Sequence, residues 1–216
     1  MIDANSIVDK NIRKFFKHVI KTCKENKVKF FLDPDDDSNN CRGSFNDIDK
    51  ELRVTLVDDN EGWIGVLVHE YSHLEQWLEQ SPIYVAKYRN LDPTSVVDYW
   101  LDGKEYGNKT LDACFMKVKE LEFDCEKRAV ENIKKWKLPI DIPKYIKGAI
   151  AYTYYYDFLR NTRNKSSVIP YEEANVLELI EPSFASRDLA IRNLEIEKLI
   201  EQNTKQTDEV EYEETV

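Results

Sequence analysis

Two histidines and a glutamate occupy one short stretch of the chain at a spacing suited to metal chemistry. His69 and His73 stand four residues apart, so on a helix both imidazoles lie on the same face. They can then bind one Zn²⁺ ion, which needs each nitrogen within about 2.0–2.1 Å. Glu70 lies about 100° further around such a helix, where its carboxylate can reach a metal-bound water without binding the metal. The pattern predicts a zinc site with Glu70 as general base.

An apolar segment leads into these residues and predicts the element that holds them. The stretch from Trp63 to Val68 is almost entirely hydrophobic, which is typical of a helix buried in a core. The acidic turn at residues 58–60 can cap such a helix, which we expect over residues 61–79. The chain has only 3 histidines, and two of them fall in this pattern, which argues against a chance pairing.

Residues 66–74, VLVHEYSHL, resemble the H-E-x-x-H signature of the zincin metallopeptidases. Metzincins continue this signature with a glycine and a third histidine, but Gln76 and Glu79 stand at those positions, which excludes that branch. The resemblance is therefore to the gluzincins, in which a carboxylate from a later helix is the third ligand. It implies zinc as cofactor and a zinc metallopeptidase as the function. The size and layout also look like minimal gluzincins and uncharacterised metallopeptidases encoded by bacteriophages.

Two glutamates in a later helix, Glu120 and Glu122, are the alternatives for the third ligand. Gluzincins commonly carry E-x-x-x-[DE] there, the first acid binding zinc and the second orienting a ligand histidine. The matching pairs are Glu120 with Asp124 and Glu122 with Glu126. Glu122 lies about 40° from the middle of the apolar stripe of this helix, and Glu120 lies on the opposite side. A carboxylate in an apolar stripe is costly unless it is paired or binds metal, which favours Glu122 as ligand and Glu126 as its partner.

The rest of the sequence predicts a small sheet followed by helices, an α+β fold that the resemblance makes zincin-like. We expect a helix over residues 5–25, strands at 29–32, 41–46 and 51–57, and further helices over 93–103, 109–137, 143–162 and 186–203. In zincins the strand beside the active-site helix often pairs with an extended substrate. Residues 51–57 are the candidate for that edge, and an ordinary internal strand is the alternative. We expect one domain over residues 1–203 and a disordered acidic tail over residues 204–216.

Composition restricts the partners and the compartment. The net charge of −10 argues against a nucleic-acid partner, which would draw on a surplus of Lys and Arg. No apolar run approaches the roughly 20 residues of a membrane span, and the N-terminus lacks a signal-peptide pattern. We expect a cytoplasmic protein, in the host cytoplasm if a phage encodes it, that acts on a peptide or protein substrate. The 4 cysteines form no CxxC pair, so reduced, mostly buried thiols are expected.

A non-catalytic protein is the second hypothesis. Zinc would then stabilise a binding protein, for example a phage protein that acts on a host factor. The presence of Glu70 argues against it, because a purely structural site has no use for a general base. A structural site would also be closed by four protein ligands. Within the enzymes, hydrolysis of a non-peptide amide is an alternative that the signature alone does not separate from peptide hydrolysis.

Overall fold

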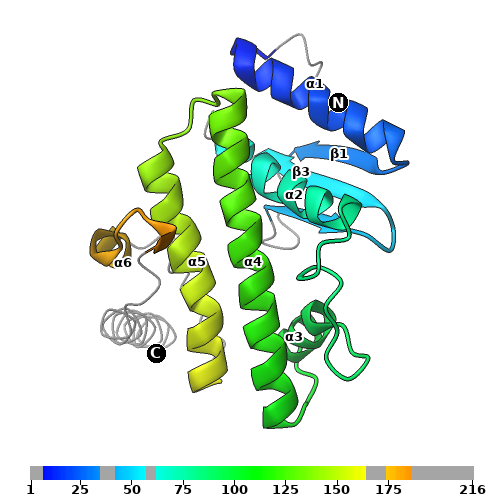
Figure 1. Ribbon diagram of the computed structural model, residues 1–216, viewed down its shortest axis with the longest axis vertical. Coiled ribbons are helices and arrows are strands. Elements are labelled where there is room, and N and C mark those ends of the chain that lie inside the picture. The colour runs from blue at the N-terminus through cyan, green and yellow to red at the C-terminus, as the bar shows by residue number, and fades with distance from the viewer. Residues whose placement is uncertain (1–6, 35–41, 57–61, 164–173, 186–216) are drawn as a thin grey trace, which may run out of the picture. The chain divides into compact units, whose positions relative to one another are not determined.

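The computed structural model describes residues 7–34, 42–56, 62–163 and 174–185, and the fold of this part is α+β (Figure 1). A three-stranded sheet is followed by a mostly helical remainder, which confirms the predicted class at this level. The described elements are α1 (Lys10–Glu25), β1 (Lys29–Pro34), β2 (Gly43–Asn46), β3 (Glu51–Leu56), α2 (Gly62–Leu78), α3 (Pro93–Leu101), α4 (Asn108–Trp136), α5 (Ile142–Thr162) and α6 (Ala174–Leu179).

The chain divides into two compact units. The first consists of Met1–Val85 and Asp124–Ile142, and the second of Ala86–Phe123 and Pro143–Val216, so helix α4 contributes to both. The single domain expected over residues 1–203 stays a prediction. The expected acidic tail and the helix expected over residues 186–203 lie outside the described residues. Among the helices that are described, none is both long and apolar enough to cross a membrane.

In the first unit, β3 is the central strand of the sheet. It pairs in parallel with β1 and antiparallel with β2, which gives the order β1-β3-β2. Of the two alternatives for residues 51–57, the internal strand is therefore the one found, and β1 and β2 are the two outer strands of the described sheet. Alternation of apolar and polar residues identifies the buried face of a strand but not its neighbours, which is why the sequence left this choice open.

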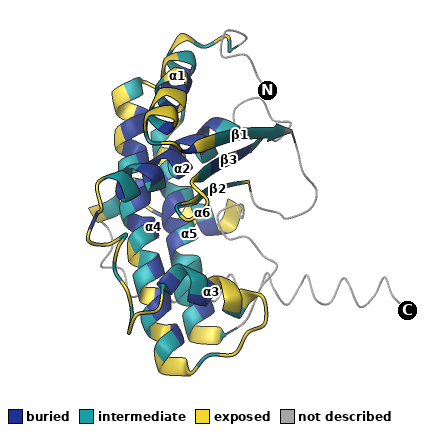
Figure 2. Cartoon of the chain, turned by 90° about the vertical axis from the view of Figure 1, so that its right-hand side faces the viewer, coloured by how far each residue is buried: buried dark blue, intermediate teal, exposed yellow. Residues whose placement is uncertain are grey.

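Helix α2 packs against β2 and β3 and is buried along most of its length (Figure 2). Its side chains Ile64, Leu67 and Leu74 are almost completely inaccessible to solvent, as are Leu52 and Val54 of β3. Since each such side chain contributes roughly 1.5–3 kcal/mol on burial, α2 is firmly anchored in the unit. Residues near the middle of α2 are consequently held in fixed positions.

The N-terminal helix α1 packs against α2 and β1. Asp9 caps its first turn by accepting hydrogen bonds from the backbone N–H groups of Asn11 (2.7 Å) and Ile12 (2.8 Å). Its apolar stripe is buried, and Phe15 packs edge to face on Tyr71 of α2 with ring centroids 5.5 Å apart. Cys23, Cys114 and Cys125 are free and buried, as expected for these three thiols.

Candidate metal centre

Helix α2 brings the two predicted histidines together. His69 and His73 lie one turn apart, and their rings stand edge to face with centroids 4.8 Å apart. Both are partly buried. The spacing of four residues thus places two imidazoles side by side on the helix that the apolar core of the first unit anchors.

Each of the two imidazoles forms a hydrogen bond through its Nδ1 atom. His69 Nδ1 lies 3.0 Å from Oε1 of Glu126, and His73 Nδ1 lies 2.9 Å from Oε1 of Gln76. A carboxylate and an amide oxygen can only accept, so in both pairs the histidine Nδ1–H is the donor. In the neutral ring the lone pair is then on Nε2, which is the arrangement found when histidine binds a metal through Nε2.

The orientation of the Gln76 amide is fixed by an acceptor on its other side. Gln76 is fully buried, and its Nε2 donates to Oδ2 of Asp124 at 2.8 Å, which also accepts from Nε of Arg128 at 2.8 Å. Because Asp124 can only accept, the amide nitrogen must face Asp124 and the amide oxygen must face His73. In the sequence, Gln76 serves only to exclude the metzincins. Residues three apart on a helix are neighbours, so the spacing of His73 and Gln76 could have predicted this contact.

Glu126 approaches His69 from helix α4. Its side chain is buried, and its Oε1 makes the 3.0 Å contact with Nδ1 of His69. Asp124, the corresponding acid of the alternative register, instead accepts from Gln76 and Arg128. Of these two acids, the structure therefore places Glu126 directly on a histidine and Asp124 one contact further away.

Cys125 is a third side chain close to the histidines. Metal-binding atoms of His69, His73 and Cys125 lie within 4.8 Å of one another, so these residues could hold a metal ion. The Cys125 thiol lies 3.7 Å from Nδ1 of His69 and donates to the backbone oxygen of His69 at 3.3 Å. These contacts bring the sulfur close to Nδ1 and to the backbone oxygen of His69. In the sequence, Cys125 looks like a core thiol, because it lacks the CxxC spacing of thiolate sites.

The protonation of His69 follows from its neighbours. Burial lowers the pKa of His69, but Cys125 and Glu126 act in the opposite direction and together raise this pKa well above the ordinary value of 6.5. The imidazole of His69 therefore holds an additional proton more tightly than a free imidazole does. A metal that binds through Nε2 must displace that proton, so metal binding releases a proton to solvent.

Glu70 lies against the edge strand of the sheet. Its side chain is 7% exposed, and the backbone of β2 passes directly beside it. A Cβ atom added to Gly43 would come 2.9 Å from Cγ and 3.1 Å from Oε1 of Glu70, and 2.4 Å from Cγ1 of Val66. Real Cβ atoms essentially never come within 3.0 Å of such neighbours, so the contacts with Val66 and with Cγ of Glu70 require glycine at position 43.

Helix α4 distinguishes the two candidate carboxylates by burial. Glu122 is 6% exposed, whereas Glu120 is exposed to solvent. This agrees with the helical geometry that put Glu122 near the apolar stripe and Glu120 on the opposite side. Glu122 belongs to the second compact unit and the histidines to the first. That Glu122 joins them as a metal ligand stays a prediction.

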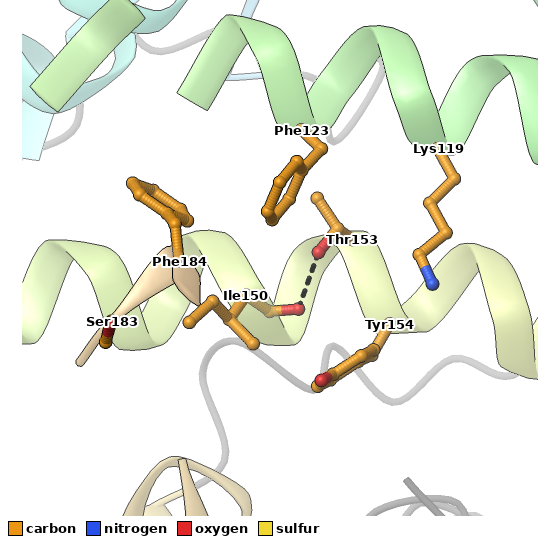
Figure 3. Close-up of a pocket in the computed structure, with 7 residues that line it drawn as sticks. All are labelled: Lys119, Phe123, Ile150, Thr153, Tyr154, Ser183 and Phe184. Atoms are coloured by element: carbon orange, nitrogen blue, oxygen red, sulfur yellow. Dashed lines mark hydrogen bonds between the residues drawn. The ribbon is translucent and has the colours of Figure 1, made fainter. Parts of the chain in front are cut away.

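The second unit contains a separate pocket between α4 and α5 (Figure 3). Phe123 and Phe184 meet edge to face at one end, with ring centroids 5.4 Å apart. The hydroxyl of Thr153 donates to the backbone oxygen of Ile150 at 2.9 Å, and Lys119 at the other end is ion-paired with Asp157. These polar groups of the lining are already engaged, so we assign no chemistry to this pocket.

Comparisons with known proteins add nothing to this geometry. No protein-family model matches the chain, and neither a curated protein nor a solved structure does. A functional assignment therefore rests on the side chains around His69 and His73.

Proposed function

We propose that this chain is a zinc metallopeptidase of the gluzincin type, with a zincin-like fold, that hydrolyses peptide bonds in a peptide or protein substrate. One observation carries the proposal. The Nδ1 atoms of His69 and His73 both lie within hydrogen-bond distance of oxygen acceptors, the orientation in which histidines bind a metal ion through Nε2. The glutamate that follows His69 is buried on the same helix. Two oriented imidazoles with an adjacent carboxylate are the arrangement that metal-assisted hydrolysis requires.

The donor set fits a catalytic zinc site. His69, His73 and Glu122 would be the three protein ligands, a set that leaves the fourth position open. When bound, zinc would polarise the carbonyl group of the substrate and lower the pKa of a water molecule. Glu126 and Gln76 hold the ligand imidazoles in the tautomer and orientation that binding through Nε2 requires.

Glu70 would act as the proton carrier. Its carboxylate takes a proton from the attacking water and returns it to the amine that leaves when the peptide bond breaks. Burial of Glu70 between α2 and β2 keeps the carboxylate from swinging into solvent, since the β2 backbone is already close to its Cγ and Oε1. The resemblance to zincins further suggests that the substrate binds as an extended chain along an outer strand of the sheet.

The His69, His73 and Cys125 cluster supports a second candidate function. If Cys125 were the third ligand, the site would resemble a structural zinc centre in a binding protein, for example a phage protein that acts on a host factor. The position of sulfur beside Nδ1 of His69, and its donation to the backbone oxygen of that residue, argue against this choice. A metal on both Nε2 atoms would lie along a different edge of the ring.

Metal analysis combined with cleavage profiling tests the proposal. We expect one zinc per chain, and loss of it in His69→Ala/His73→Ala. Wild-type protein should cut a peptide library, whereas Glu70→Gln should keep zinc and fold but lose cleavage, because glutamine preserves size and removes the base. Glu131→Gln, an exposed position on α4, is the matched control and should cut normally. Full zinc retention in the double variant, or normal cleavage by Glu70→Gln, would refute the proposal.

A further inference from the structure

The side of helix α1 that faces solvent carries a row of lysines. Figure 2 shows α1 with an exposed side and a buried side. Five lysines recur on the exposed side at intervals of four and three residues, which places them within about 80° of one another around the helix. They are Lys10, Lys14, Lys17, Lys21 and Lys24, and all are exposed. The row is about 21 Å long, because each residue of a helix adds about 1.5 Å.

Acidic side chains of the described residues leave most of this row unneutralised. Glu25 is the one acidic residue within α1, and it pairs with Lys21 at 3.7 Å where both side chains are mostly exposed. An exposed pair of this kind is weak and exchanges readily with another partner. Lys10, Lys14 and Lys24 have no acidic partner within the part of the chain that the structure describes. Ammonium groups along the whole row can therefore meet carboxylates of a ligand.

The C-terminal end of α4 extends the basic surface of α1. The side chain of Asn11 donates to the backbone oxygen of Lys137 at 3.0 Å, which places the start of α1 beside the end of α4. Burial lowers the pKa of His18, and the charges of Lys135 in α4 and Lys21 in α1 lower it further. Lysines from the two helices thus lie close enough to act on one imidazole. The exposed lysines at this end of α4 are Lys134, Lys135 and Lys137.

This basic surface lies away from the metal centre. Helix α1 contacts α2 through Tyr71, whose ring packs on Phe15 and whose hydroxyl lies 2.8 Å from Nε2 of His18. On α2, Tyr71 points about 160–200° away from His69 and His73. The lysine row in turn lies on the side of α1 opposite its buried stripe. A ligand on the row is therefore separated from the two histidines by α1 and α2 themselves.

The charge of α1 contrasts with that of the rest of the chain. The helix has five lysines and one arginine against one glutamate, a net charge of +5, whereas the whole chain carries −10. The residues outside α1 therefore carry −15. A short acidic ligand on the row meets mainly lysines, since charges act over only about 8 Å at physiological ionic strength. A long nucleic acid would also face the acidic remainder, and the buried apolar stripe leaves α1 no face to insert into a membrane.

We propose that the lysine row of α1, together with the lysines at the end of α4, is a docking surface for a short acidic segment of another protein. An extended chain covers the row with about six or seven residues of roughly 3.3 Å each. Its side chains on one side repeat about every 6.6 Å, and successive lysines about every 4.5–6 Å along the helix, so several carboxylates can each meet an ammonium group. Because single exposed ion pairs are weak, binding depends on several acting together and decreases with salt.

Titration of the full-length protein with a fluorescent decaglutamate peptide tests this surface. We expect binding at about 50 mM salt that weakens as salt is raised. The variant Lys10→Gln/Lys14→Gln/Lys24→Gln should bind about tenfold more weakly, because three charge contacts are lost while glutamine remains a good helix former. A decapeptide of glycine and serine should not bind. Glu70→Gln should bind decaglutamate as the wild type does, because the row is remote from the metal centre.

A second triple variant controls for net charge. Lys104→Gln/Lys109→Gln/Lys144→Gln removes three exposed lysines of the second compact unit and has the same net charge as the α1 variant. It should bind decaglutamate with wild-type affinity. Equal affinities of the two triple variants would overturn the proposal, as would binding of the neutral decapeptide as tight as that of decaglutamate.

Other occupants of the row are distinguished by further titrations. A DNA duplex of about 20 base pairs and vesicles containing phosphatidylserine should bind more weakly than decaglutamate. Tighter binding of either, lost in the α1 variant, would overturn the choice of a protein segment. Self-association that the α1 variant abolishes would make a second copy the occupant instead. Neutralising the acidic residues near the C-terminus should leave decaglutamate binding unchanged, and about tenfold tighter binding would show that they occupy the row: Asp208→Asn, Glu209→Gln, Glu211→Gln, Glu213→Gln and Glu214→Gln.

Discussion

The identity of the third ligand decides which kind of site this is. Two imidazoles and a carboxylate leave zinc an open position, whereas a thiolate would move the site towards the closed centres of structural proteins. The Cys125 sulfur lies 3.7 Å from Nδ1 of His69, the same ring nitrogen that donates a hydrogen bond to Glu126. Burying the Glu122 carboxylate costs free energy, and binding a metal would offset that cost.

We expect Glu122→Gln to weaken zinc binding about a hundredfold or more, because loss of a direct ligand costs at least as much as loss of a supporting contact. Cys125→Ser, which can keep the hydrogen bond to the His69 backbone oxygen, should change the affinity only slightly. Glu120→Gln at the exposed position should leave it unchanged within about twofold. Zinc affinity is measured by competition with a chromophoric chelator. A large loss in Cys125→Ser alone would establish the His-His-Cys site, and a large loss in Glu120→Gln would establish the other register.

The site residues differ in how far the sequence could predict them. His69, Glu70 and His73 follow from spacing on a single helix, since residues four apart share a face. The E-x-x-x-E spacing pointed to Glu126, which the structure brings to His69. Gln76 and Cys125 were not anticipated, because their contacts depend on how α2 packs against α4, and pairings between helices leave no periodicity in the sequence.

At the scale of elements, helices were easier to predict than the arrangement of strands. Helices expected over 61–79, 93–103, 109–137 and 143–162 correspond to α2, α3, α4 and α5, and the expected hairpin corresponds to β2 and β3. A helix is specified by local periodicity and caps. The order β1-β3-β2 depends instead on the parallel pairing of β3 with β1, which is a contact between strands distant in the sequence. The short helix α6 (Ala174–Leu179) was not predicted, because it is too short for an apolar period to show.

The close packing of β2 on α2 makes Gly43 the most sensitive position of this interface. Gly43→Ala should destabilise the fold by about 1–3 kcal/mol, the usual cost of overpacking. Val66 cannot easily move aside, because a β-branched side chain has essentially one rotamer in a helix. The hydrolysis that we propose for this chain should fall as well, because the new methyl group also displaces Glu70. Thermal unfolding and cleavage of a library-derived peptide measure the two effects.

Two further variants make this prediction specific. Gly43→Ala/Val66→Ala removes the tightest clash, at 2.4 Å, and should recover much of the lost stability. Gly148→Ala in α5 adds a methyl group with nothing within 4 Å, and should stabilise the protein by about 0.5–1 kcal/mol because alanine is the better helix former. If Gly43→Ala behaved like Gly148→Ala, the close contact of β2 with Glu70 would not exist in solution.

For the whole molecule, the proposed binding of zinc would be linked to folding through the proton on His69. The raised pKa of His69 means that the folded, metal-free protein holds this proton more tightly than the unfolded chain does. Its contribution to stability is complete below about pH 6.5, the unfolded value, and is lost as pH rises through the folded pKa. Zinc competes with the same proton, so its affinity increases over the same range. Zinc bound to the folded state adds stability that grows with its affinity. The stability that comes from the His69 proton therefore falls as pH rises, whereas the stability that comes from zinc increases.

We therefore expect the gain in unfolding temperature on adding zinc to increase steadily from about pH 6 to pH 8. Below the folded pKa of His69, zinc affinity should rise about tenfold per pH unit, because one proton is displaced by each metal ion. Calorimetric scans with excess zinc and with chelator, at matched ionic strength, give the difference at each pH. His18→Gln is the control: burial lowers the pKa of His18, whose Nε2 lies 2.8 Å from the Tyr71 hydroxyl rather than at the metal centre. This substitution should change the metal-free curve near pH 6 but leave the zinc increment intact. A zinc increment that stays constant or falls as pH rises would show that zinc does not displace the His69 proton.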